Sequence, residues 1–161
     1  MKLYEQYAPI KDKYLQDIKK EHNNISIKYF IDWHDPKSYF DSAIDADKLG
    51  KEVSQKEALN KGLYSKVTFT DDKPIFQEAF NKDKDIMKRY FDAKGRVVFR
   101  IDYDDEKEDG FAIFKFRDDN KWMDFIYCYD KQCIVNDYLN ADAPEYKGNT
   151  EHLPPGEIIY E

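Results

Sequence analysis

The chain has 161 residues, a length typical of one domain that buries about two-thirds of its unfolded surface without a metal or disulfide. Aromatic residues make up 16% of it, too many for a disordered chain, and no apolar run reaches the roughly 20 residues of a membrane helix. Residues 1–100 carry 20 Lys and Arg against 17 Asp and Glu, whereas residues 101–161 carry 6 against 16. This acidic part repels phosphates, which argues against nucleic acid or an anionic membrane as partner and favours a basic protein.

The N-terminal segment predicts a helix. Pro9 suits a first helical turn, where its missing N–H costs nothing, and Ile10, Tyr14 and Ile18 recur every four residues. Residues 1–7 include an acid and no apolar stretch, so they do not resemble a signal peptide. We therefore expect a cytoplasmic protein whose first element packs one apolar stripe on a core.

A strand over residues 25–31 and a less regular region, 33–63, come next. The residue before a proline avoids the α region, so Asp35-Pro36 predicts a break. Ser54-Gln55-Lys56-Glu57 is a capping-box pattern and Gly62 suits a helix end, which together predict a short second helix.

From Tyr64 the apolar period becomes two, which is typical of strands separated by polar turns. Asp92-Ala93-Lys94-Gly95 has the composition of a type I turn, with Asp first and Gly last. Parallel crossovers need a dozen or more residues, so connections this short require antiparallel pairing. The predicted strands are 66–70, 74–80, 86–91, 96–103, 111–117, 122–129 and 132–139.

The sequence therefore predicts a single α+β domain over residues 1–161. Its core is an antiparallel β-meander of seven to eight strands, with the N-terminal helix and the short second helix packed on one face. Residues 1–63 supply the N-terminal helix, a first strand and a region of helix and loop, residues 64–139 the meander, and residues 140–161 a wrapping tail that ends in a strand at 158–160.

An acidic run begins in the predicted strand 96–103 and continues through the predicted loop 104–109: Asp102, Asp104, Asp105, Glu106, Glu108 and Asp109. It is either a solvated hairpin loop or a contact surface for a basic partner. The spacing of the first acids resembles a calcium loop, but Lys107 occupies the position that needs glycine, and the bidentate glutamate is missing. We expect no metal here.

Rings occur on both faces of the last two predicted strands. Most belong to the core, but those on an uncovered face would form a patch beside the acidic run, and Tyr and Trp are favoured interface anchors. The candidate partner-binding aromatics are Trp122, Tyr127 and Tyr129.

Cys128 and Cys133 face each other if Asp130-Lys131 is a two-residue turn, with Cα atoms roughly 4.5 Å apart. That separation is at the near edge of disulfide geometry. In a reducing cytoplasm we expect two buried thiols.

No pattern of catalysis stands out. The chain lacks a nucleophile elbow, a glycine-rich phosphate loop and a zinc-protease helix, and it has six glycines. His34 beside Asp35 is the nominal candidate for a base or a metal ligand, although a loop histidine bound to a neighbouring carboxylate is the more common explanation of such a pair. We predict no enzyme and no cofactor.

In size, acidity and its aromatic meander, exemplified by residues 90–96 (Tyr-Phe-Asp-Ala-Lys-Gly-Arg), the chain resembles the immunity proteins of bacterial polymorphic and contact-dependent toxin systems. The resemblance implies a non-catalytic, cytoplasmic inhibitor whose acidic side chains cap the active site of a basic toxin, for example a nuclease domain. The alternative is a small-ligand-binding module with a cavity in a curved sheet.

Overall fold

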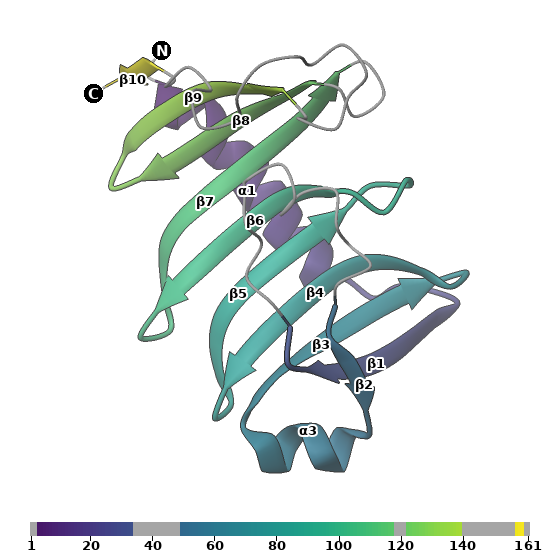
Figure 1. Cartoon of the computed structure of the whole chain (residues 1–161). Coiled ribbons are helices and arrows are strands. Elements are labelled where there is room, and N and C mark those ends of the chain that lie inside the picture. Colours follow the sequence, from purple (N-terminus) through teal and green to yellow (C-terminus); the bar gives the residue numbers. More distant parts are fainter. Residues whose placement is uncertain (1–2, 34–48, 118–121, 140–156, 160–161) are drawn as a thin grey trace.

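The computed structural model describes residues 3–33, 49–117, 122–139 and 157–159. Its strands form one ten-stranded antiparallel sheet in the order β10-β9-β8-β7-β6-β5-β4-β3-β1-β2, with helix α1 running across it (Figure 1). The predicted α+β meander with an N-terminal helix is confirmed. The elements are α1 (Leu3–Lys19), β1 (Ile25–Ile31), β2 (Lys51–Val53), α3 (Gln55–Lys61), β3 (Leu63–Thr70), β4 (Lys73–Asn81), β5 (Lys84–Phe91), β6 (Val97–Asp104), β7 (Lys107–Arg117), β8 (Trp122–Tyr129), β9 (Gln132–Leu139) and β10 (Glu157–Ile159).

The sheet exceeds the predicted seven to eight strands because two three-residue strands, β2 and β10, form its edges. Strand β2 was not predicted, since three residues are too few to show a period. It pairs with β1, and β1 pairs with β3, so the chain passes from β2 to β3 through α3 without pairing the two. Helix α3 itself was predicted: the Ser54 hydroxyl accepts the Glu57 N–H at 3.1 Å, and Gly62 ends the helix with φ +83°.

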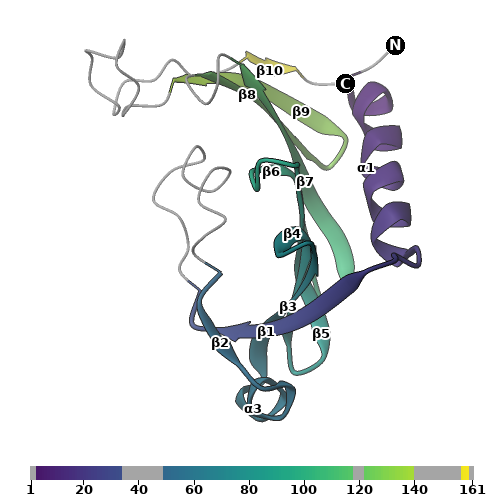
Figure 2. The ribbon, with the colours of Figure 1, turned by 90° about the vertical axis from the view of Figure 1, so that its right-hand side faces the viewer.

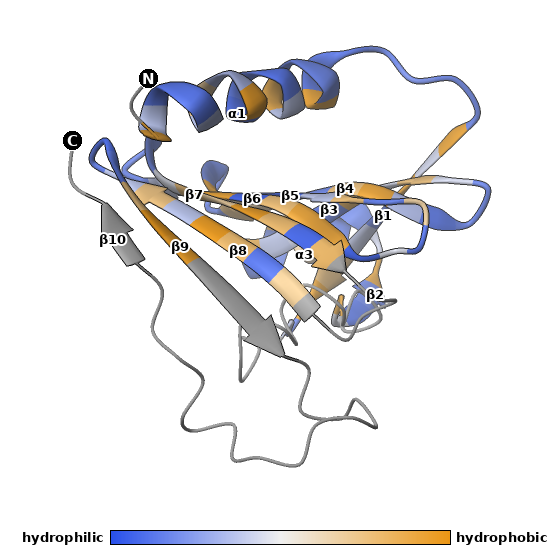
Figure 3. Ribbon diagram, turned by 90° about the horizontal axis from the view of Figure 1, so that it is seen from above, coloured by the Kyte–Doolittle hydropathy of each residue, from blue (hydrophilic) through white to orange (hydrophobic). Residues whose placement is uncertain are grey.

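Helix α1 begins six residues before the predicted start, so that Pro9 lies inside it. A proline in this position removes one helical hydrogen bond. The six extra residues are nevertheless helical because Leu3, Tyr4 and Tyr7 pack against the sheet in the same core cluster as Ile10 and the following apolar residues. Hydrophobic and hydrophilic residues alternate along α1, as in an amphipathic helix (Figure 3).

The two ends of the sheet curve away from α1 (Figure 2). We call the side that packs on α1 the helix face and the opposite side the concave face. Because side chains alternate along each strand, these two faces hold separate core clusters. On the helix face the buried residues are Tyr7, Phe99, Ile101, Phe111, Ile113, Ile126, Cys128 and Cys133. On the concave face they are Phe30, Leu49, Val67, Phe69, Phe91, Val97, Ala112, Phe114, Met123 and Phe125.

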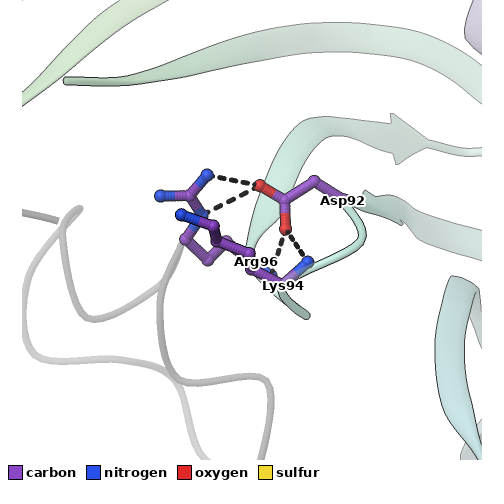
Figure 4. Close-up of polar contacts among 3 residues, drawn as sticks. All are labelled: Asp92, Lys94 and Arg96. Carbon is purple, nitrogen blue, oxygen red and sulfur yellow. Dashed lines mark hydrogen bonds and ion pairs between the residues drawn. The ribbon is translucent and has the colours of Figure 1, made fainter. Parts of the chain in front are cut away.

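Two-residue turns join four of the hairpins, and both residues of each have positive φ, which is the geometry of a type I′ turn. The connection from β5 to β6 is different and follows the prediction. Its Gly95 N–H donates to the Asp92 carbonyl at 2.9 Å, as in a type I turn. The Asp92 carboxylate also accepts the Lys94 and Arg96 backbone N–H groups and binds the Arg96 side chain at 2.8 Å (Figure 4).

Candidate functional site

The acidic run lies on a tight hairpin, not on the predicted loop over residues 104–109. Strand β6 continues to Asp104 and β7 begins at Lys107, so only Asp105 and Glu106 form the turn, with φ of 48° and 64°. Their positive φ matches the right-handed twist of the flanking strands. Pairing of Tyr103 with Glu108 then extends the hairpin beyond the β7–β8 pairing, which ends at Gly110.

The exposed acids of this hairpin form what we call the acidic tip: Asp104, Asp105, Glu106, Glu108 and Asp109. Two of them have cationic partners. The Lys84 ammonium lies 3.5 Å from Asp105, and the Lys11 ammonium of α1 donates to Glu108 at 2.7 Å. In the described part of the chain, Asp104, Glu106 and Asp109 form no ion pair, so the tip keeps a negative charge.

The pair between α1 and the tip is the shorter and the less exposed of the two. Burial acts to lower the pKa of Lys11, but its hydrogen bond to Glu108 and the charge of that carboxylate outweigh this effect, so the pKa is raised. The Lys84–Asp105 pair is exposed on both sides and contributes little. Asp102, the sixth predicted acid, is only partly exposed and binds the Arg100 guanidinium at 2.9 Å instead of pointing to a partner.

Tyr129 lies next to the acidic tip. It pairs with Gly110 in the β7–β8 ladder, one residue from Asp109, and its side chain is 50% exposed. Tyr127 is only partly exposed, stacks on Phe125 at 6.2 Å and packs on the concave-face core. A Cβ at Gly110 would lie 2.5 Å from the Tyr127 hydroxyl, so glycine makes room for that ring. Trp122 begins β8, but its side chain lies outside the described part of the structure.

Cys128 and Cys133 are register partners, as the two-residue turn predicts, with a Cα–Cα distance of 4.2 Å. They form a disulfide, so the expectation of two free thiols is wrong for this structure. The geometric reason is that directly opposed residues in this ladder already hold their side chains within bonding reach. Both residues are buried in the helix-face cluster.

The nominal catalytic pair, His34 and Asp35, lies outside the described residues, as does His152. His22 is described, and its Nε2 lies 2.8 Å from the Asp17 carbonyl while its ring contacts Phe76. His22 therefore has a structural role, joining the end of α1 to β4. Within the described ranges, no group of three or more His, Cys, Asp or Glu side chains is arranged to hold a metal ion.

The structure also brings together polar residues that sequence reasoning missed. Gln77 of β4 and Arg89 of β5 are register partners, and both are buried on the concave face. Arg89 Nε donates to Gln77 Oε1 at 2.8 Å, and Nη2 donates to the same oxygen. Burial and then the charge of Arg100 lower the pKa of Arg89 to about 10, so the guanidinium remains charged at neutral pH. The alternation of side chains along β4 and β5 was enough to predict that the two residues lie on the same face of the sheet. It could not show that this face is buried from water.

None of the described helices is both long enough and apolar enough to cross a bilayer. Comparison with protein-family models, with curated proteins and with solved structures finds no match to this chain.

Proposed function

We propose that this chain is a non-catalytic, cytoplasmic binding protein that captures a basic protein through the acidic tip and Tyr129. The observation that carries the proposal is the placement of exposed carboxylates without ion-pair partners in the described chain beside a half-exposed tyrosine on the adjacent strand. Carboxylates of this kind steer a basic partner toward the surface, and a ring with few rotatable bonds anchors it.

The class of partner follows from the charge and from the resemblance to immunity proteins. A toxin nuclease domain is basic because its cleft binds phosphates, and carboxylates that occupy this cleft exclude the substrate. The mechanism is steric and electrostatic, and it requires no catalytic residue. It also predicts that binding weakens as salt rises, because exposed charges are screened over about 10 Å at 0.1 M ionic strength.

The first test is affinity capture from a cell lysate at low and high salt, followed by binding kinetics with the captured basic protein. The test variant is Asp104→Asn/Glu106→Gln/Asp109→Asn, which neutralises three acids of the tip. The matched control is Glu21→Gln/Asp71→Asn/Asp72→Asn, which removes the same charge from exposed positions away from the tip. We expect the test variant to slow association about tenfold or more at low salt and the control to change it little. Equal effects of both variants would mean that only net charge matters, and the assigned surface would be wrong.

The Tyr129→Ala variant distinguishes the short-range contact of the tyrosine ring from the long-range attraction of the carboxylates. We expect faster dissociation with an unchanged association rate, because the ring contributes short-range contact. A partner that binds Tyr129→Ala as tightly as the wild type would remove the tyrosine from the interface.

The second candidate function, a small-ligand-binding module, is favoured by one specific observation. On the concave face the Ser65 hydroxyl and the Gln77 amide nitrogen are buried and have no hydrogen-bond partner in the described part of the chain, although buried polar groups are normally satisfied. Thermal unfolding with a panel of metabolites tests this function, and a flat panel would argue against it.

A further inference from the structure

The concave face carries three polar side chains on adjacent strands. Gln77 and Arg89 are directly opposed, and Ser65 of β3 is opposed to Ala79, two residues along β4 from Gln77. Diagonal neighbours on one face of a sheet lie about 7–8 Å apart, within reach of long side chains. Ser65 and Gln77 are 0% exposed and Arg89 is 7% exposed.

These three residues have more donors than acceptors. A guanidinium has five N–H donors and no acceptor. The only acceptor that the described residues offer to Arg89 is Gln77 Oε1, which receives both Nε and Nη2. The Gln77 amide nitrogen and the Ser65 hydroxyl, both buried, have no hydrogen-bond partner among the described residues. The cluster therefore lacks an acceptor group with several lone pairs.

The cluster also lacks negative charge. The charged group that acts on Arg89 is Arg100, its register partner on β6, which repels it. Asp102 is engaged by Arg100, with two contacts to one carboxylate oxygen at 3.1 and 2.9 Å. Among the described residues Arg89 has no ion-pair partner. A buried cation in this state is costly, since desolvation is not offset by an opposite charge.

We propose that Arg89, Gln77 and Ser65 form a binding site for one carboxylate group of a small organic acid. A carboxylate accepts two parallel N–H bonds from a guanidinium and retains lone pairs for the amide and the hydroxyl. One buried guanidinium balances the single charge of a carboxylate, whereas a phosphate group would bring a second charge without a partner. This site is independent of the acidic tip, and it gives the ligand-binding candidate a chemical class.

The test is thermal unfolding of the full chain in increasing sodium acetate, with sodium chloride holding the ionic strength constant. We expect the Tm of the wild type to rise with the logarithm of acetate concentration, because acetate binds the folded state only. Arg89→Met should weaken acetate binding about tenfold to a hundredfold, the loss expected for charge-assisted hydrogen bonds. The matched control is Lys84→Met, which removes an exposed cation of the same sheet and should leave the response unchanged.

Gln77→Glu tests the site while keeping Arg89, so its result does not depend on the stability of a variant that lacks the arginine. The new carboxylate would replace the Gln77 amide, form an ion pair with Arg89 and remove the amide donor that the ligand needs. We expect a higher Tm than that of the wild type in the absence of acetate, and loss of the acetate response. A lower Tm, or an acetate response that persists, would overturn the proposal.

Two further outcomes would also overturn it. A wild-type Tm that does not respond to acetate would mean that the cluster binds no carboxylate and that water satisfies its donors. A larger rise with inorganic phosphate than with acetate, lost in Arg89→Met, would assign the site to phosphate-bearing ligands instead. Because neither readout involves a protein partner, failure here leaves the proposed capture of a basic protein untouched.

Discussion

Gly50 provides the strongest single test of the sheet edge. It precedes β2, has φ +99°, and an added Cβ would lie 2.2 Å from the Ile31 carbonyl oxygen and 2.9 Å from the Trp33 backbone nitrogen. Both neighbours are backbone atoms, so neither can rotate away. Gly95 is the matched control, because its φ is +77° and a Cβ there would meet no atom within 4 Å.

Both substitutions place a side chain at positive φ, but only Gly50→Ala also brings the new Cβ into contact with backbone atoms. A side chain at positive φ costs roughly 1–2 kcal/mol, and the loss of glycine's freedom in the unfolded chain returns about 0.4–1 kcal/mol. Gly95→Ala should therefore reduce the free energy of unfolding by about 1 kcal/mol. Gly50→Ala adds an overpacking cost of about 1–3 kcal/mol, since the β1–β2 pairing of Ile31 with Lys51 must open to relieve the contact. We expect a total loss of about 2–4 kcal/mol.

Urea unfolding of both variants, followed by tryptophan fluorescence and circular dichroism, measures the difference directly. The slope with urea should remain that of the wild type, so that the midpoints alone report stability. Equal losses in the two variants would refute the close approach of Gly50 to the end of β1, and with it the placement of β2.

Three further substitutions or treatments test contacts described above. The Tyr90 hydroxyl donates to the Asp17 carboxylate of α1, and Tyr90→Phe should cost about 1–2 kcal/mol in urea unfolding. Burial and this bond raise the pKa of Tyr90, so its contribution is complete below the unfolded pKa of about 10 and is lost at higher pH; a wild type and Tyr90→Phe that differ equally at pH 8 and pH 11 would contradict this. Asp92→Ala should cost about 2 kcal/mol and Asp92→Asn about half as much, since asparagine keeps one acceptor oxygen; identical urea midpoints for the two would contradict the bonding in the turn. Reduction of the Cys128–Cys133 disulfide should lower stability by about 2 kcal/mol, the estimate for so short a loop, and urea midpoints with and without dithiothreitol give the answer.

The regular succession of short strands and tight turns was the most informative pattern in the sequence. Period-two apolar patterns and polar turns were sufficient to place β3 to β9 and their antiparallel pairing, because each strand is determined by its own residues and those of its neighbours. The start of α1 was misplaced because Pro9 is locally unfavourable inside a helix, whereas packing of Tyr7 on the sheet decides the outcome. Tertiary packing of this kind is not visible in local sequence.

The candidate site likewise has a part that the sequence predicted and a part that it did not. The acidic residues and Tyr129 were identified from composition and strand position, and the structure places Glu108 and Asp109 on β7, the strand that pairs with the β8 strand of Tyr129. The Arg89–Gln77 pair was missed because its importance comes from burial, and burial depends on residues that are distant in the sequence. An arginine in an alternating strand is normally exposed, so no local pattern indicates that this one is closed to water.

The strand order also has a kinetic consequence. From β3 to β9 each strand pairs with the next one in the sequence, so these pairings join residues that are close along the chain. Strand β1 instead pairs with β3, and this pairing closes a loop that contains β2 and α3. Local pairings form faster than distant ones, since less chain entropy is lost in closing them. In pulsed hydrogen exchange during refolding, amides of β4 to β8 should therefore gain protection before those of β1.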